Sequence, residues 1–276
     1  GHFNLFPVTV EPSQPHGGSK VQEWIANRLS ARAFFDAAHA LPGAPIIQVN
    51  HARLGFAAYF DFTGWDGVSW PPPMPVNFDA LEVLSGFLAY SLPRDPRLEI
   101  AIRDLYTLTQ HGVLVSATGN SDTHHLNGIL AGFPRTYVRM PKAPAPLPRS
   151  FSALDFMDAL RRRHTVASTG PWLDVLVNGE RAGDTAMAHG GMVNVEIHIR
   201  QASFVHANRV RVFVSGQLRR TLPIPEGARS FDWSGLELTG AADTWIGVDT
   251  MGDDPLPIEL TGNYLEQFQG MRPAAV

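Results

Sequence analysis

The first 170 residues alternate short apolar runs with stretches of helical periodicity, and this alternation constrains the fold more than any other feature. Apolar runs occur at 46–49, 80–84 and 113–117. Before the third run, Asp95-Pro96 has the cap and first-turn residues of a helix. Strands that alternate with helices favour a parallel sheet with right-handed crossovers. In such sheets, functional residues gather at the carboxyl ends of the strands.

The pattern changes after residue 170. The apolar run 172–177 ends at Asn178-Gly179, which is a hairpin turn signal. Val and Ile then alternate with polar residues in the segments 193–199 and 210–214, as they do in strands that bury one face. We therefore expect the second half of the chain to form an all-β sandwich.

Composition narrows the possible functions. A chain of 276 residues can hold two ordinary domains, and we expect them at 1–170 and 171–276. The net charge of −4 gives no reason to expect nucleic acid or an anionic membrane as a partner. No apolar run approaches the ~18 residues of a membrane span. The chain has no cysteine, so His and carboxylate are the metal ligands left to it, while the compartment stays open.

A carboxylate and two imidazoles lie within four residues after the third apolar run, at Asp122, His124 and His125. Side chains two apart on extended backbone point the same way, so Asp122 and His124 are able to bind one metal ion. The alternative is a solvated loop in which Asp122 caps the next element. His51 follows the first run, and His2 lies beside another short apolar run at the start of the chain.

Three segments in this order resemble the polymerase-and-histidinol-phosphatase (PHP) metallohydrolases, most closely the CehA/McbA branch. They are GHFNLFP at 1–7, VNHAR at 49–53 and GNSDTH at 119–124. The resemblance covers about residues 1–170, and the later TVASTGPWLDVLVNG fits the same branch. With the β-rich second half, it implies an α/β fold. We expect a partial, distorted parallel β/α barrel of the PHP type, followed by an all-β sandwich-like domain.

The resemblance also implies a cluster of two or three divalent metal ions, Zn, Mn or Fe. Carried over residue by residue, its ligands here are His2, His51, Asp122 and His124. The implied function is hydrolysis of an ester, phosphoester or carbamate bond in a small-molecule substrate by a metal-activated water.

Three further residues have expected roles. His125 is a candidate proton-transfer or substrate-binding group, because an imidazole titrates near neutral pH. Arg53 lies two residues past His51 and is a candidate for stabilising an oxyanion, with a surface arginine as the alternative. Glu82 lies in the middle of an apolar run, so its carboxyl group must be paired or face a cavity.

The chain departs from the family in one respect. A His-x-His pair, an Asp-His and a Glu, which the family places before the GHFN segment, do not occur here. We therefore expect a fragment that is nearly inactive alone, with the remaining ligands on a missing N-terminal segment or a companion chain. The competing expectation is a non-catalytic carbohydrate- or protein-binding module on a vestigial PHP scaffold. A nucleophilic hydrolase is disfavoured, because no Gly-x-Ser-x-Gly occurs.

Overall fold

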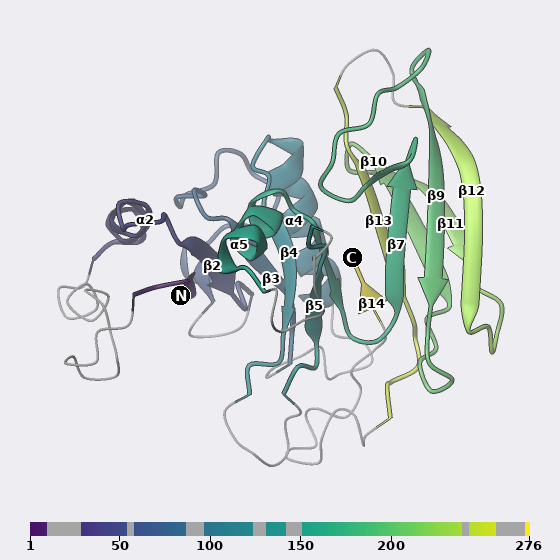
Figure 1. Cartoon of the computed structure of the whole chain (residues 1–276), viewed down its shortest axis with the longest axis horizontal. Helices are drawn as coiled ribbons and strands as arrows, with labels where there is room; N and C mark the ends of the chain where they lie inside the picture. Colours follow the sequence, from purple (N-terminus) through teal and green to yellow (C-terminus); the bar gives the residue numbers. More distant parts are fainter. Residues whose placement is uncertain are drawn as a thin grey trace.

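The computed structural model describes residues 1–9, 29–53, 58–86, 97–123, 131–141, 151–238, 243–257 and 274–276, and every statement below concerns these ranges. The strands form three sheets, here named A, B and C (Figure 1). Figure 1 shows the helices gathered around sheet A, with sheets B and C stacked to its right. No helix in these ranges is both long and apolar enough to cross a membrane.

Sheet A places three parallel strands beside an antiparallel edge strand. Its order is β1 (His2–Phe6), β2 (Ile46–Asn50), β3 (Ala80–Ser85) and β4 (Ser116–Asn120). The strands β2, β3 and β4 run parallel, while β1 runs antiparallel to β2. The connections between successive strands carry α2 (Ala31–His39), α3 (Tyr59–Phe62) and α4 (Arg97–Gln110). The two parallel steps, β2 to β3 and β3 to β4, are thus connected through α3 and α4, as parallel strands require a crossover.

The two faces of sheet A differ in chemistry. Side chains alternate along a strand, so Ile47 and Val49 of β2 share one face with Leu81 and Val83 of β3. These four are buried in the main apolar core, together with apolar residues of α2 and α4. The opposite face carries Asn4, Gln48, Asn50, Glu82, Thr118 and Asn120. One face of the sheet thus builds the core, and the other presents polar side chains.

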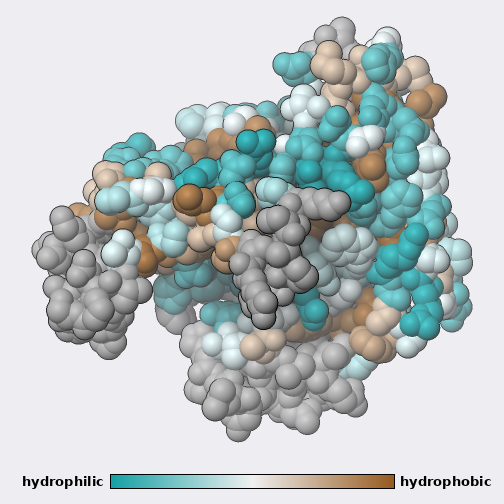
Figure 2. All heavy atoms as spheres, viewed as in Figure 1, coloured by the Kyte–Doolittle hydropathy of each residue, from teal (hydrophilic) through white to brown (hydrophobic). Residues whose placement is uncertain are grey.

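Sheets B and C are antiparallel and pack face to face. The order of sheet B is β11 (Gln217–Pro223), β10 (Arg209–Val214), β13 (Ile246–Met251), β14 (Ala274–Ala275), β6 (Thr165–Ser168) and β5 (Arg135–Val138). The order of sheet C is β12 (Ser230–Leu238), β9 (Met192–Arg200), β7 (Trp172–Val177) and β8 (Glu180–Arg181). Their facing side chains share one core, which includes Val195, Ile197, Val210 and Val212. Hydrophilic residues predominate on the visible outer surface of these sheets (Figure 2).

The expected parallel β/α barrel is wrong. In the described ranges, sheet A has four strands, one of them antiparallel, and it does not close on itself. The next two strands, β5 and β6, pair antiparallel with each other and belong to sheet B. Alternating apolar runs and helices predict parallel pairing, but closure depends on the number, tilt and stagger of all the strands together. That information is not contained in the local pattern.

Sheets A and B meet along a seam between β4 and β5. The Thr136 hydroxyl accepts a hydrogen bond from the Gly119 N–H at 2.9 Å and donates one to the Gly119 carbonyl oxygen at 3.0 Å. A Cβ at Gly119 would lie 2.9 Å from the Arg135 carbonyl oxygen, so only glycine permits this approach. The seam fixes the end of β4 against sheet B, which itself combines strands from both sides of residue 170.

Candidate functional site

His2 and His51 meet at the carboxyl edge of the parallel strands. Because β1 runs antiparallel to β2, its first residue lies beside the end of β2, where His2 pairs with Asn50. His2 Nδ1 lies 3.0 Å from His51 Nε2, and the two rings are edge-to-face with centroids 4.9 Å apart. Burial and the neighbouring His2 lower the pKa of His51, so this imidazole is neutral at pH 7. Neutral imidazole is the form that binds metals.

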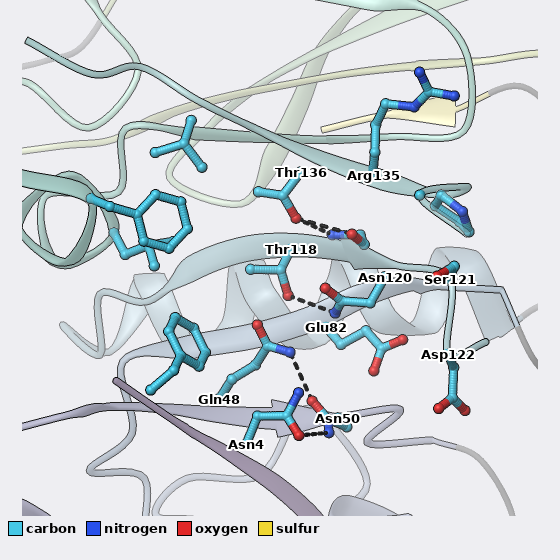
Figure 3. A pocket seen from close by; sticks show the side chains of 17 residues that line it. Asn4, Gln48, Asn50, Glu82, Thr118, Asn120, Ser121, Asp122, Arg135 and Thr136 are labelled. Atoms are coloured by element: carbon cyan, nitrogen blue, oxygen red, sulfur yellow. Dashed lines mark hydrogen bonds between the residues drawn. The ribbon is translucent and has the colours of Figure 1, made fainter. Parts of the chain in front are cut away.

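Two carboxyl groups, of Glu82 in β3 and of Asp122 after β4, act on His51. Glu82 in β3 accepts a hydrogen bond from the His51 backbone N–H at 2.8 Å through Oε2. Burial raises the pKa of Glu82 to about 8, and the negative charge of Asp122 adds to the rise while the His51 N–H opposes it. Asp122 follows β4 and also interacts electrostatically with His51. Figure 3 shows the Glu82 carboxyl group directed toward the Asp122 side of the pocket.

The residues that follow β2 and β4 have unusual backbone conformations. His51 has φ of 30° and Asp122 has φ of 50°, in the left-handed region that residues other than glycine rarely adopt. Such conformations cost on the order of 1–3 kcal/mol each and cluster at functional sites. They also correct one sequence argument, because Asp122 is not extended and the alternation of a strand does not apply to it. His124 and His125, its expected neighbours in the site, lie outside the described residues.

The described residues fit part of a divalent metal site. Two nitrogen ligands of a tetrahedral zinc ion lie roughly 3.3 Å apart, close to the 3.0 Å between His2 and His51. His51 Nδ1 and Glu82 Oε1 are buried polar atoms without a hydrogen-bond partner in the described ranges. Within those ranges, however, no three His, Asp or Glu side chains form a group that could hold a metal ion. The histidine pair therefore needs donors in addition to those described.

Arg53 is tied into the structure by its guanidinium group. Its Nε and Nη2 donate to the two carboxylate oxygens of Asp104 at 2.6 and 3.0 Å. Its Nη1 donates to Asp61 at 3.0 Å and to the Trp65 carbonyl oxygen at 2.6 Å. All three nitrogens thus bind residues of α4 and of the segment around α3. The expected oxyanion role of Arg53 stays a prediction, whereas its structural role is evident from these contacts.

A cavity of about 490 Å³, lined by both polar and apolar side chains, opens beside Glu82 and Asp122 (Figure 3). It lies between the polar face of sheet A, β5, and α5 (Ala153–Arg161). Three amides line it in a hydrogen-bonded row: Gln48 Nε2 donates to Asn50 Oδ1 at 2.8 Å, and Asn50 Nδ2 donates to Asn4 Oδ1 at 3.0 Å. On β4, the side-chain amide of Asn120 donates to the Thr118 hydroxyl at 3.3 Å.

Sequence reasoning missed this amide row, although a signal was present. Gln48 interrupts the apolar run 46–49 in the same way that Glu82 interrupts the run 80–84. Both are almost fully buried, with 4% and 3% of their surface exposed. When neighbouring buried strands each carry a polar residue within an apolar run, these residues can share one face of the sheet. The polar groups on such a face must line a cavity or form hydrogen bonds.

Comparisons with known proteins identify no relative of this chain. No protein-family model matches the chain, and no curated protein or solved structure matches it either. The resemblance to the PHP metallohydrolases therefore stays a prediction that rests on three short motifs. The structure adds one observation that does not depend on any relative. His2 and His51, which belong to two of those motifs, are in contact although 49 positions separate them.

Proposed function

We propose that this chain is a metal-dependent hydrolase that cleaves an ester, phosphoester or carbamate bond in a small-molecule substrate. The observation that carries the proposal is the 3.0 Å approach of His2 Nδ1 to His51 Nε2 at the carboxyl edge of sheet A. Glu82 accepts a hydrogen bond from the His51 backbone N–H, and the charge of Asp122 acts on both His51 and Glu82. Imidazole and carboxylate donors without thiolate suit Zn²⁺, Mn²⁺ or Fe²⁺.

His2 and His51 would hold the metal as its described nitrogen donors. Asp122, whose charge already acts on His51, and His124 would complete the set by closing on the ion as it binds. A metal in such a site lowers the pKa of a bound water toward neutrality and polarises a substrate oxygen. Glu82 acts on the site through His51, because its hydrogen bond to the His51 N–H fixes the backbone that carries the imidazole. This support holds the histidine pair in place before any ligand binds, which is what a catalytic site requires.

Hydrolysis of an activated ester tests the proposal. The protein that contains this chain is stripped with EDTA, supplied with Zn²⁺, Mn²⁺ or Fe²⁺, and assayed with p-nitrophenyl acetate and p-nitrophenyl phosphate. We expect hydrolysis that depends on the metal and falls on the order of a thousandfold in Asp122→Ala. Asp232→Ala removes a carboxylate from sheet C and serves as the matched control. Full activity in Asp122→Ala would remove Asp122 from the proposed site, and absence of metal-dependent hydrolysis in the wild type would leave the non-catalytic binding module as the better account.

A further inference from the structure

The cavity beside Glu82 and Asp122 is lined by side chains that suit an uncharged ligand. The row formed by Asn4, Asn50 and Gln48 offers amide N–H donors and carbonyl acceptors, and these two kinds of group sit next to each other. The Thr118 hydroxyl and the Asn120 amide add further groups across the neighbouring strand. Hydroxyl groups of a ligand also donate and accept, so such a lining can pair with several of them at once.

Positive charge is scarce in this lining. Among the described residues around the cavity, Arg135 is the only Lys or Arg. Its side chain is exposed, its guanidinium carbon lies 5.8 Å from the centre of the Phe133 ring, and Figure 3 shows it pointing away from the amide row. Phosphate sites normally combine Arg or Lys with backbone N–H groups at a helix start. The nearby carboxylate of Asp122 further disfavours an anion.

The cavity also has apolar side chains in its lining. Phe6 of β1, Val138 of β5, and Phe156 and Leu160 of α5 also line it. A sugar ring combines hydroxyl groups at its rim with C–H groups on its faces, so it can use both kinds of side chain. Ligand sites are usually built in this way, with apolar walls and a few placed polar groups that fix orientation.

We propose that this cavity binds an uncharged, hydroxyl-rich part of the substrate, such as a sugar or polyol. The inference rests on the proposed hydrolase function and narrows it to an ester or carbamate of a hydroxyl-rich molecule rather than a phosphoester. In this arrangement the amide row holds the hydroxyl groups, and the bond to be cleaved lies toward Asp122 and the histidine pair.

Saturation-transfer NMR with methyl glucoside as the probe tests this proposal on the whole chain in EDTA. We expect transfer to the sugar and no displacement of it by inorganic phosphate. Gln48→Leu should weaken binding about fivefold, the cost of one or two uncharged hydrogen bonds. Thr118→Val keeps the shape of the side chain, removes its hydroxyl and should weaken binding about threefold. Thr221→Val, on the exposed part of β11, is the matched control and should change nothing.

The proposal would be overturned by no transfer to the sugar, or by transfer that phosphate competes away. Equal affinity in folded Gln48→Leu and Thr118→Val would do the same, and circular dichroism shows whether each variant is folded. Because metal is absent from this titration, its failure leaves the metal site standing. Intact sugar binding without any metal-dependent hydrolysis would instead refute the proposed function and leave the cavity as a sugar-binding site.

Discussion

The ionisation of a single side chain in this protein follows from the donors around it, and Asp66 shows this most simply. It lies in the loop after α3, and its Oδ1 accepts hydrogen bonds from the N–H groups of Val68 at 2.8 Å and Ser69 at 2.7 Å. Its Oδ2 accepts one from the Ser69 hydroxyl at 2.6 Å. The Ser69 hydroxyl first, and then these backbone donors, lower the pKa of Asp66 to about 2.

Ser69→Ala should raise the pKa of Asp66 toward its ordinary value of 3.8, because the first of these donors is lost. Carbon-13 NMR of the carboxyl group across an acid titration measures the change, and Ser230→Ala on β12 is the control. Since the folded pKa lies below the unfolded one, the charged form stabilises the fold above pH 3.8, and this contribution is lost as pH falls toward about 2. An unchanged pKa in Ser69→Ala would contradict the hydrogen-bond assignment.

Elements of the first half are held together by the ion pair between Arg53, just after β2, and Asp104 on α4. The Arg53 side chain is 11% exposed and that of Asp104 is 1% exposed, so the pair is shielded from water. Its guanidinium group also lies over the rings of Phe60 and Trp65, at 5.3 and 5.5 Å from their centres. The pair thus ties the end of β2, and with it His51, to α4.

Asp104→Ala should destabilise the protein by about 3–5 kcal/mol, because it leaves a buried guanidinium group without its main partner. Urea unfolding followed by circular dichroism measures the loss. Asp158→Ala breaks the exposed pair with Arg162 on α5 and should cost no more than about 0.5 kcal/mol. Equal effects of the two substitutions would show that the Arg53 pair is as weak as a surface ion pair.

The bounds of the strands show what the local pattern can predict. The apolar run 46–49 predicts β2 to within one residue, whereas the run 113–117 misplaces the strand observed at Ser116–Asn120. β4 extends into polar residues because they find partners inside the protein. The Ser116 hydroxyl, for example, donates to the Leu160 carbonyl oxygen at 2.6 Å. Apolarity alone does not reveal such partners, which come from distant parts of the chain.

At the scale of the whole molecule, α4 joins sheet A to sheet B. Its Leu108 is buried in the core of sheet A, while the Tyr106 ring lies 4.9 Å from Phe213 of β10 and 5.1 Å from Trp245 beside β13. The Trp245 indole N–H also donates to Gln110 at 3.0 Å. The sequence indicated a change of pattern after residue 170. It did not indicate the contact between α4 and sheet B, because that contact depends on how the sheets pack. The same limit explains why the barrel expectation failed.

Tyr106→Ala should lower the free energy of unfolding by about 2–4 kcal/mol, because a large ring is removed from between the sheets. Tyr106→Phe keeps the ring and removes a buried hydroxyl that has no hydrogen-bond partner in the described ranges, so it should cost little. Unfolding is followed by tryptophan fluorescence and by far-ultraviolet circular dichroism. If Tyr106→Ala left both unfolding curves unchanged, the packing of α4 between sheets A and B would not stabilise the protein.

The central claim is that the His2–His51 pair binds a metal ion and that Asp122 joins the pair as a ligand when the ion is bound. Calorimetric titration of the EDTA-stripped protein with Zn²⁺ tests it most directly. We expect binding that His51→Ala and Asp122→Ala each weaken by at least about a hundredfold, because each removes a ligand. His206→Ala removes an exposed histidine far along the sequence and should leave the affinity unchanged. Equal Zn²⁺ affinity in the wild type, His51→Ala and Asp122→Ala would contradict the account.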